Sequence, residues 1–101
     1  MNPPEGRSVV GDLTADYRTT LLRFLPRRDE AARASAYELG RRAFSQGVSL
    51  LDVCRVHHEV VLEVLSQTKA DELLGVTEKA AELLLEVLAS YDMTHRVVLE
   101  P

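Results

Sequence analysis

Aromatic residues are scarce in this sequence, which has three Tyr, two Phe and no Trp among 101 residues. With so few rings, a core has to be built mainly from Leu, Val and Ala, the usual material of helix bundles. Hydrophobic residues make up 46% of the chain and charged residues 28%, a balance typical of a folded globular protein. A chain of this length supports one hydrophobic core. We therefore expect a single all-α domain.

Cysteine and long apolar runs are also rare. Cys54 is alone and cannot close an intramolecular disulfide. No segment has the basic start and apolar run of a signal peptide. The longest apolar-rich stretch, residues 80–89, contains Glu82 and Glu86 and is too short to cross a bilayer. We expect a cytoplasmic protein that does not contact membranes.

Positive charge is not in excess, because the formal net charge is -4 and the pI is about 5.3. Proteins that bind nucleic acid generally gather a surplus of Lys and Arg on one face, where these residues neutralise phosphates. We therefore expect no nucleic-acid partner. A helical DNA-binding protein is the third and least favoured interpretation.

Motifs for catalysis and metal binding are missing as well. The sequence has no P-loop, no dinucleotide-binding fingerprint and no Asp-rich metal motif. Cys54 and His58 are four residues apart, which is half of a zinc site, but no further ligand follows nearby. His57 shares helical spacing with Val53 and Val61, so we expect a core or interface histidine with one hydrogen-bonded nitrogen. We expect no enzyme activity, cofactor, metal or small-molecule substrate.

What the sequence does have is helical periodicity, after a leader at residues 1–12 that is rich in Pro and Gly and that we expect to be flexible. The domain is then expected at 13–98, followed by a tail at 99–101. The spacing of apolar residues predicts four helices. They are expected from Leu13 to Pro26, from Asp29 or Glu30 to Phe44, from Leu50 to Ser66, and, after a hinge at residues 73–75, from a Thr77 cap to Val98.

The second predicted helix has unusually small apolar residues. Alanines along one face let another helix approach closely, and Gly40 extends that contact. The residues expected to form this small face include Ala31, Ala34, Ala36 and Ala43.

The last predicted helix is apolar around most of its circumference between Ala80 and Tyr91. A helix that covers one core needs an apolar stripe only a little over 100° wide. Either this is the central helix of the bundle, or a second copy of the chain covers the surplus in a symmetric dimer. The second interpretation predicts a homodimer through the last helix, with Leu84, Leu85, Leu88 and Tyr91 in the interface.

Four segments together resemble one known family. They are Tyr37-Glu38-Leu39-Gly40-Arg41-Arg42-Ala43, Gly47-Val48-Ser49-Leu50-Leu51-Asp52, Val56-His57-His58 and Tyr91-Asp92-Met93-Thr94-His95-Arg96. Their order and spacing resemble the N-terminal domain of RsbU-type serine phosphatases, over roughly residues 12–98.

The resemblance implies a dimeric four-helix bundle that is related in fold to the C-terminal domain of the clock protein KaiA and has no catalysis of its own. In that family the domain receives a switch kinase of the RsbT type. The contact turns on an attached PP2C-type phosphatase that depends on manganese or magnesium, within the partner switching that controls sigma factors in bacterial stress responses.

The resemblance also places the kinase contact near Glu30, Ala34 and Ala89. Ala34 stands where the best-known members have a larger aromatic residue, and Glu30 has an alternative interpretation as a favourable charge at a helix start. The main rival function is a stand-alone dimerisation or scaffold module without a kinase partner.

Overall fold

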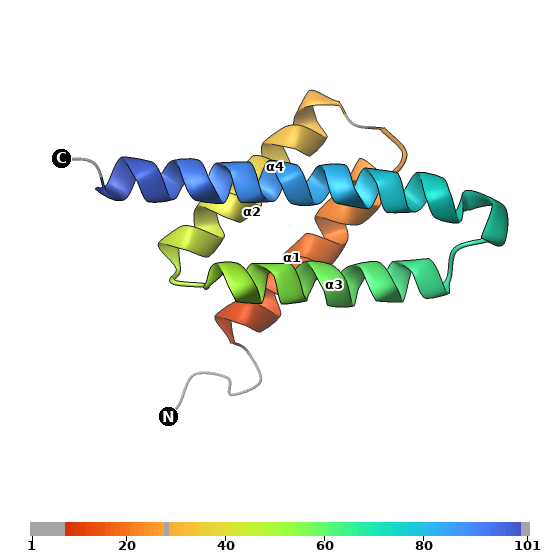
Figure 1. Ribbon diagram of the computed structural model, residues 1–101, viewed down its shortest axis with the longest axis horizontal. Helices are drawn as coiled ribbons and strands as arrows, with labels where there is room; N and C mark the ends of the chain where they lie inside the picture. The colour runs from red at the N-terminus through yellow and green to blue at the C-terminus, as the bar shows by residue number, and fades with distance from the viewer. Residues whose placement is uncertain (1–7, 28, 100–101) are drawn as a thin grey trace.

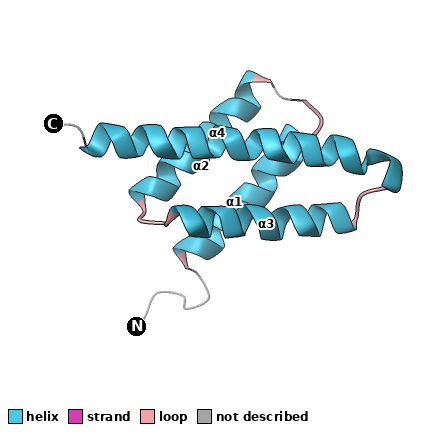
Figure 2. Ribbon diagram, in the orientation of Figure 1, coloured by secondary structure: helices cyan, strands magenta, loops and turns pink. Residues whose placement is uncertain are grey.

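The computed structural model describes residues 8–27 and 29–99, which form four α-helices and one short 3-10 helix and include no strand (Figure 2). The all-α prediction is confirmed. The elements are α1 at Val9–Phe24, α2 at Glu30–Ser45, α3 at Leu50–Ser66, the 3-10 helix η1 at Ala70–Glu72, and α4 at Leu73–Leu99.

The helices form two layers. α3 and α4 lie side by side in one layer and run in opposite directions, while α1 and α2 lie in the other layer and cross them obliquely (Figure 1). The shortest dimension of the molecule is 22 Å, as expected for two layers of helices whose axes are roughly 8–10 Å apart. α4 is the longest helix, and its last turns extend beyond the start of α3 (Figure 1).

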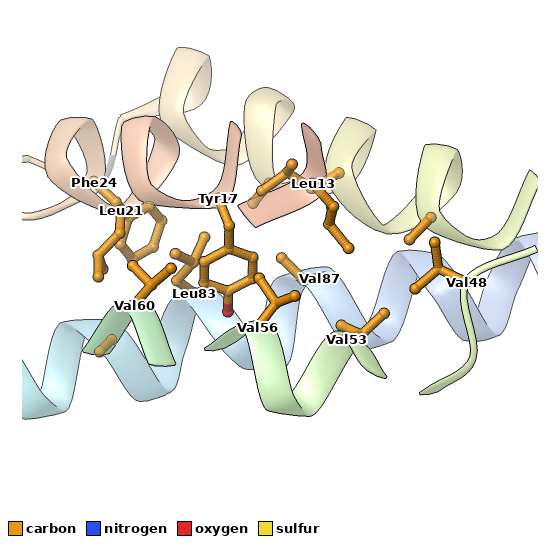
Figure 3. Close-up of a cluster of buried hydrophobic side chains, with 14 of the residues drawn as sticks. Leu13, Tyr17, Leu21, Phe24, Val48, Val53, Val56, Val60, Leu83 and Val87 are labelled. Atoms are coloured by element: carbon orange, nitrogen blue, oxygen red, sulfur yellow. The ribbon is translucent and has the colours of Figure 1, made fainter. Parts of the chain in front are cut away.

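The core fills the space between the layers. Leu13, Tyr17, Leu21 and Phe24 recur at helical spacing on α1 and are all buried. Figure 3 shows them pointing toward a row of small apolar side chains on α3 and α4. That row consists of Val53, Val56 and Val60 on α3 and Leu83 and Val87 on α4.

The small face of α2 permits a very close crossing with α4. A Cβ atom added to Gly40 would lie 1.9 Å from Ser90 Oγ and 2.2 Å from the Val87 carbonyl oxygen, so only glycine fits at this point. The predicted close approach is confirmed. The predicted row was wrong at Ala31 and Ala34, which are exposed, because α2 turns Ala32 inward instead.

Two helix starts differ from the prediction. α1 begins at Val9, inside the expected leader, because Ser8 caps it by accepting a hydrogen bond from the Gly11 N–H at 2.9 Å. α4 begins at Leu73, so the expected hinge at 73–75 is helical. The 3-10 turn η1 leads directly into α4, and Thr77 bonds back to the Leu73 carbonyl within the helix instead of capping it. Residues 1–7 and 100–101 lie outside the described part of the chain.

Polar contacts join the layers at their edges. Arg18 on α1 donates two hydrogen bonds of 2.9 Å to the carboxylate of Glu63 on α3. Lys79 on α4 donates a 2.6 Å hydrogen bond to the carbonyl of Leu25, directly after α1. The last carbonyls of a helix have no partner within the helix, and Lys79 provides a donor for one of them. Among the described helices, none combines the length and hydropathy needed to cross a bilayer.

Candidate protein-interaction surfaces

α4 has a buried side and an exposed side, and both are apolar. Ala80, Leu83 and Val87 are buried against α1 and α2, but Leu85 is 67% exposed and Leu74 is 72% exposed. The prediction that the chain does not cover the whole apolar circumference of its last helix is therefore confirmed. A solvated surface of this kind marks a site of interaction when the exposed side chains form a continuous patch.

One exposed margin of α4 faces α3, and we call it the α3–α4 groove. Leu84, Leu88 and Tyr91 are half-buried along it, next to the exposed Leu85, so the four predicted interface residues follow one another along this margin and the outer face. The phenol of Tyr91 donates a 2.7 Å hydrogen bond to the Val48 carbonyl. Tyr91 thus also holds the loop between α2 and α3.

The open end of the α3–α4 groove contains a hollow of about 460 Å³, which we call the ring pocket. The Phe44 ring lies edge-on to the Tyr91 ring, at 5.4 Å between centroids and 90° between planes, and 5.4 Å from the tilted His95 ring. Leu50 at the start of α3 is 49% exposed. The six lining residues are Phe44, Leu50, Leu88, Tyr91, Asp92 and His95.

The other exposed margin of α4 faces α2, and we call it the α2–α4 patch. Tyr37, Met93, Val97 and Val98 are large apolar residues with exposed side chains, and they line one shallow hollow of about 240 Å³ together with Arg41 and Thr94. The sequence analysis did not identify Met93 and Val97 as surface residues of an interaction site. Their position could have been predicted, because both continue the four-residue spacing that starts at Ala89.

The residues predicted to contact a partner, Glu30 and Ala34 on α2 and Ala89 on α4, are all exposed. Glu30 and Ala34 are one turn apart on α2, and Tyr37 follows within the next turn. Ala89 is one turn before Met93 on α4 and precedes Ser90, which touches α2 at the crossing. Glu30 and Ala34 therefore share a helix face with Tyr37, and Ala89 shares one with Met93, although none of the three lines the hollow of the α2–α4 patch.

Charges near the α2–α4 patch are paired within α2. Arg41 donates a 3.2 Å hydrogen bond from Nε to the carboxylate of Glu38, and a second bond joins its terminal nitrogen to the other oxygen. The hydrogen bond to Arg41 holds the pKa of Glu38 below its ordinary value. The pair is half exposed, so it costs little to open for a partner.

The buried Tyr17 is hydrogen-bonded to the half-buried His57, with Oη and Nδ1 2.6 Å apart. Burial raises the pKa of Tyr17 and lowers the pKa of His57, so the phenol donates to a neutral imidazole. The predicted hydrogen-bonded histidine is confirmed, and the neighbouring His58 is exposed. Cys54 is half-buried. Within residues 8–27 and 29–99, no three His, Cys, Asp or Glu side chains lie close enough together to hold a metal ion.

Comparison with known families matches residues 15–94, more than three quarters of the chain, to the family described as "Phosphoserine phosphatase RsbU, N-terminal domain". The match includes the Gly40 crossing, five of the six residues that line the ring pocket, and Tyr37 and Met93 of the α2–α4 patch, and it ends one residue before His95. No curated protein and no solved structure shows significant similarity to the chain.

Proposed function

Because the chain belongs to the family of RsbU phosphatase N-terminal domains, we propose that it is a regulatory protein-binding domain that forms a homodimer and binds a switch kinase of the RsbT type. The observation that carries the proposal is the presence of two separate exposed apolar surfaces on the two margins of α4. One surface suits a second copy of the chain, and the other suits a different protein.

The dimer is assigned to the outer face of α4 and the α3–α4 groove. Leu84, Leu85 and Leu88 lie within two turns of each other, and Leu51 and Leu62 on α3 are also more than half exposed. Each leucine that becomes fully buried at an interface contributes roughly 1.5–3 kcal/mol. A symmetric contact uses every such residue twice, since the same patch is present on both copies.

The kinase is assigned to the α2–α4 patch. Its apolar side chains are accessible from solvent, and we place the exposed carboxylate of Glu30, about two turns before Tyr37 on α2, at the edge of the contact. A helix of the partner that carries apolar residues at four-residue spacing and a basic residue at one end would fit such a surface. Ala34 and Ala89 have small side chains and allow the backbone of the partner to come close.

Both surfaces use the same helix, so binding at one margin can affect the other. α4 is fixed to α2 at the Gly40 crossing, and packed helices tend to occupy discrete arrangements. We propose that kinase binding changes how the two copies of α4 pack and thereby controls a PP2C-type phosphatase in bacterial stress signalling. The domain itself has the non-catalytic role of its family.

The kinase assignment is tested with Glu30→Lys, measured by calorimetric titration against an RsbT-type kinase encoded near this protein. We expect binding to weaken at least about tenfold, because a repulsive charge replaces an attractive one at the edge of the interface. The matched control is Glu59→Lys, which makes the same change of charge at an exposed position on α3. Equal binding by both variants and the original chain would remove Glu30 from the interface.

The rival function, a scaffold without a kinase partner, is separated by the same titration. A scaffold forms the dimer but binds no such kinase, whatever residue stands at position 30. A neighbouring pair of genes for a small GHKL-type kinase and a STAS-domain protein favours the kinase assignment. The lack of such genes favours the scaffold.

A further inference from the structure

The ring pocket combines aromatic rings with a carboxylate, a combination that a protein–protein contact does not require. Three rings from two helices surround it, with the Phe44 ring set at 90° to Tyr91 and at 51° to His95. An aromatic ring has an electron-rich face and an electron-poor edge, so a ring attracts a cation that lies over its face. A volume of about 460 Å³ falls within the range of small-molecule sites.

The pocket also has a negative charge at its rim. Asp92 is the lining residue that carries a formal charge at neutral pH, and it is bonded to Arg96 through a 3.0 Å contact from Nε to Oδ2. Arg96 is 73% exposed and does not line the pocket. Since an exposed ion pair at this spacing is weak, a cation inside the pocket can take the carboxylate from Arg96.

We propose that the ring pocket is a binding site for an alkylated ammonium ion, such as the quaternary head of a small organic cation. The ring faces attract the positive charge, Asp92 pairs with it, and Leu50 and Leu88 cover its methyl groups. The proposal goes beyond the protein-binding function and requires that the second copy of the chain leave the ring pocket open, since Leu88 and Tyr91 belong both to the pocket and to the proposed dimer contact.

The site is built from rigid parts. Tyr91 is held by its hydrogen bond to the Val48 carbonyl, and Phe44 lies in the last turn of α2, just after the fixed crossing at Gly40. Leu50 is the first residue of α3, directly after the cap formed by Ser49. A preformed site loses less conformational entropy when a small ligand binds.

The test uses choline and its neutral isostere 3,3-dimethylbutan-1-ol, which replaces the ammonium nitrogen by carbon at the same shape. Each is titrated into the full chain while the ring protons of Phe44, Tyr91 and His95 are followed by NMR. We expect choline to shift these signals in a saturable way, and to bind about two- to thirty-fold more tightly than the alcohol. Equal binding of the two compounds overturns the proposal, because it would show a merely apolar hollow.

Three variants sharpen the test. Asp92→Asn and His95→Leu are each expected to weaken choline binding several-fold, since one removes the charge and the other a ring. Arg96→Gln is expected to strengthen it, since Asp92 loses its competitor. The control is Glu86→Gln, which removes a carboxylate from an exposed position of the same helix outside the pocket, and it should leave choline binding unchanged.

A second copy of the chain is the competing occupant of the pocket. If the ring signals shift with protein concentration and choline no longer moves them in the dimer, the pocket belongs to the dimer interface and the proposal fails. The dimer itself is tested separately through Leu85, which does not line the pocket, so the two outcomes are distinguishable.

Discussion

α4 meets its two neighbours in opposite ways. At α2 the backbones approach so closely that a single Cβ atom at Gly40 would collide with Ser90 and Val87. At α3 the side chains of Leu50, Leu84 and Leu88 remain partly or largely exposed along an open groove. The first contact is complete within one chain, and the second has space for another molecule.

The comparison shows how the same helix can be both a structural element and a binding element. Small residues at the α2 crossing fix the position of α4 through close packing, which tolerates little change of volume. Large residues on the outer side contribute little to the stability of one chain, because water still covers them. Substitutions should therefore separate the two roles.

The largest effect is expected from Gly40→Val. The new side chain cannot fit against α4, so the helices must move apart, and we expect a loss of about 3 kcal/mol or more, at the upper end of the cost of overpacking. Thermal and urea unfolding measure it. The control is Gly75→Ala, where the added Cβ meets nothing within 4 Å. It should stabilise the helix by about 0.5–1 kcal/mol, and a similar loss in both variants would refute the tight crossing.

An intermediate effect is expected from pH, through the buried Tyr17–His57 pair. Burial lowers the pKa of His57 in the folded protein, so the unfolded chain binds the proton more readily once the pH falls below about 6.5. The free energy of unfolding should therefore decrease between pH 7 and pH 5, with a slope of at most about 1.4 kcal/mol per pH unit from this group.

The contribution of His57 is isolated by comparing two variants at adjacent positions. His57→Gln should flatten the dependence of stability on pH in this window, because the variant has no imidazole at position 57 that the unfolded chain could protonate more readily than the folded one. His58→Gln should weaken the dependence only in part, since the charge of His58 is the smaller of the two causes that lower the pKa of His57. Urea unfolding at fixed protein concentration provides the measurement, and the same slope in both variants would exclude His57 as the cause.

The smallest effect is expected from Arg18→Ala at the edge between α1 and α3. Arg18 and Glu63 form two hydrogen bonds of 2.9 Å, but their side chains are 37% and 49% exposed. Solvent screening makes such an exposed pair weak. A double-mutant cycle with Glu63→Ala measures the coupling, which should be small and should weaken in high salt. A large coupling that does not change with salt would show that α3 is held by this pair and not by the core.

The sequence predicted those features that depend on the residues of a single helix. Helical spacing identified the four main helices, and the small residues of α2 predicted its close crossing with α4. The start of α4 could not be predicted in this way, because Gly75 and Thr77 resemble an interruption and a cap. Whether they act so depends on η1, which directs the chain straight into the helix.

The candidate surfaces were predictable only in part. Leu85 could be expected on an exposed face because the excess of apolar residues on one helix is visible in the sequence, whereas Ala89 was suggested only by the family resemblance. The ring pocket could not, since Phe44 and His95 are far apart in the chain and only the crossing of α2 over α4 brings their rings to 5.4 Å. Distances between helices depend on how their side chains pack together, and the residue pattern of one helix does not contain that information.

The central claim is that a second copy of the chain covers the outer side of α4, and sedimentation velocity on Leu85→Glu tests it most directly. Leu85 is 67% exposed in one chain, so the charged variant should keep the helical circular dichroism of the original protein while changing from dimer to monomer at tens of micromolar. The account is contradicted if the original chain is already a monomer at that concentration, or if the folded variant sediments as the same dimer.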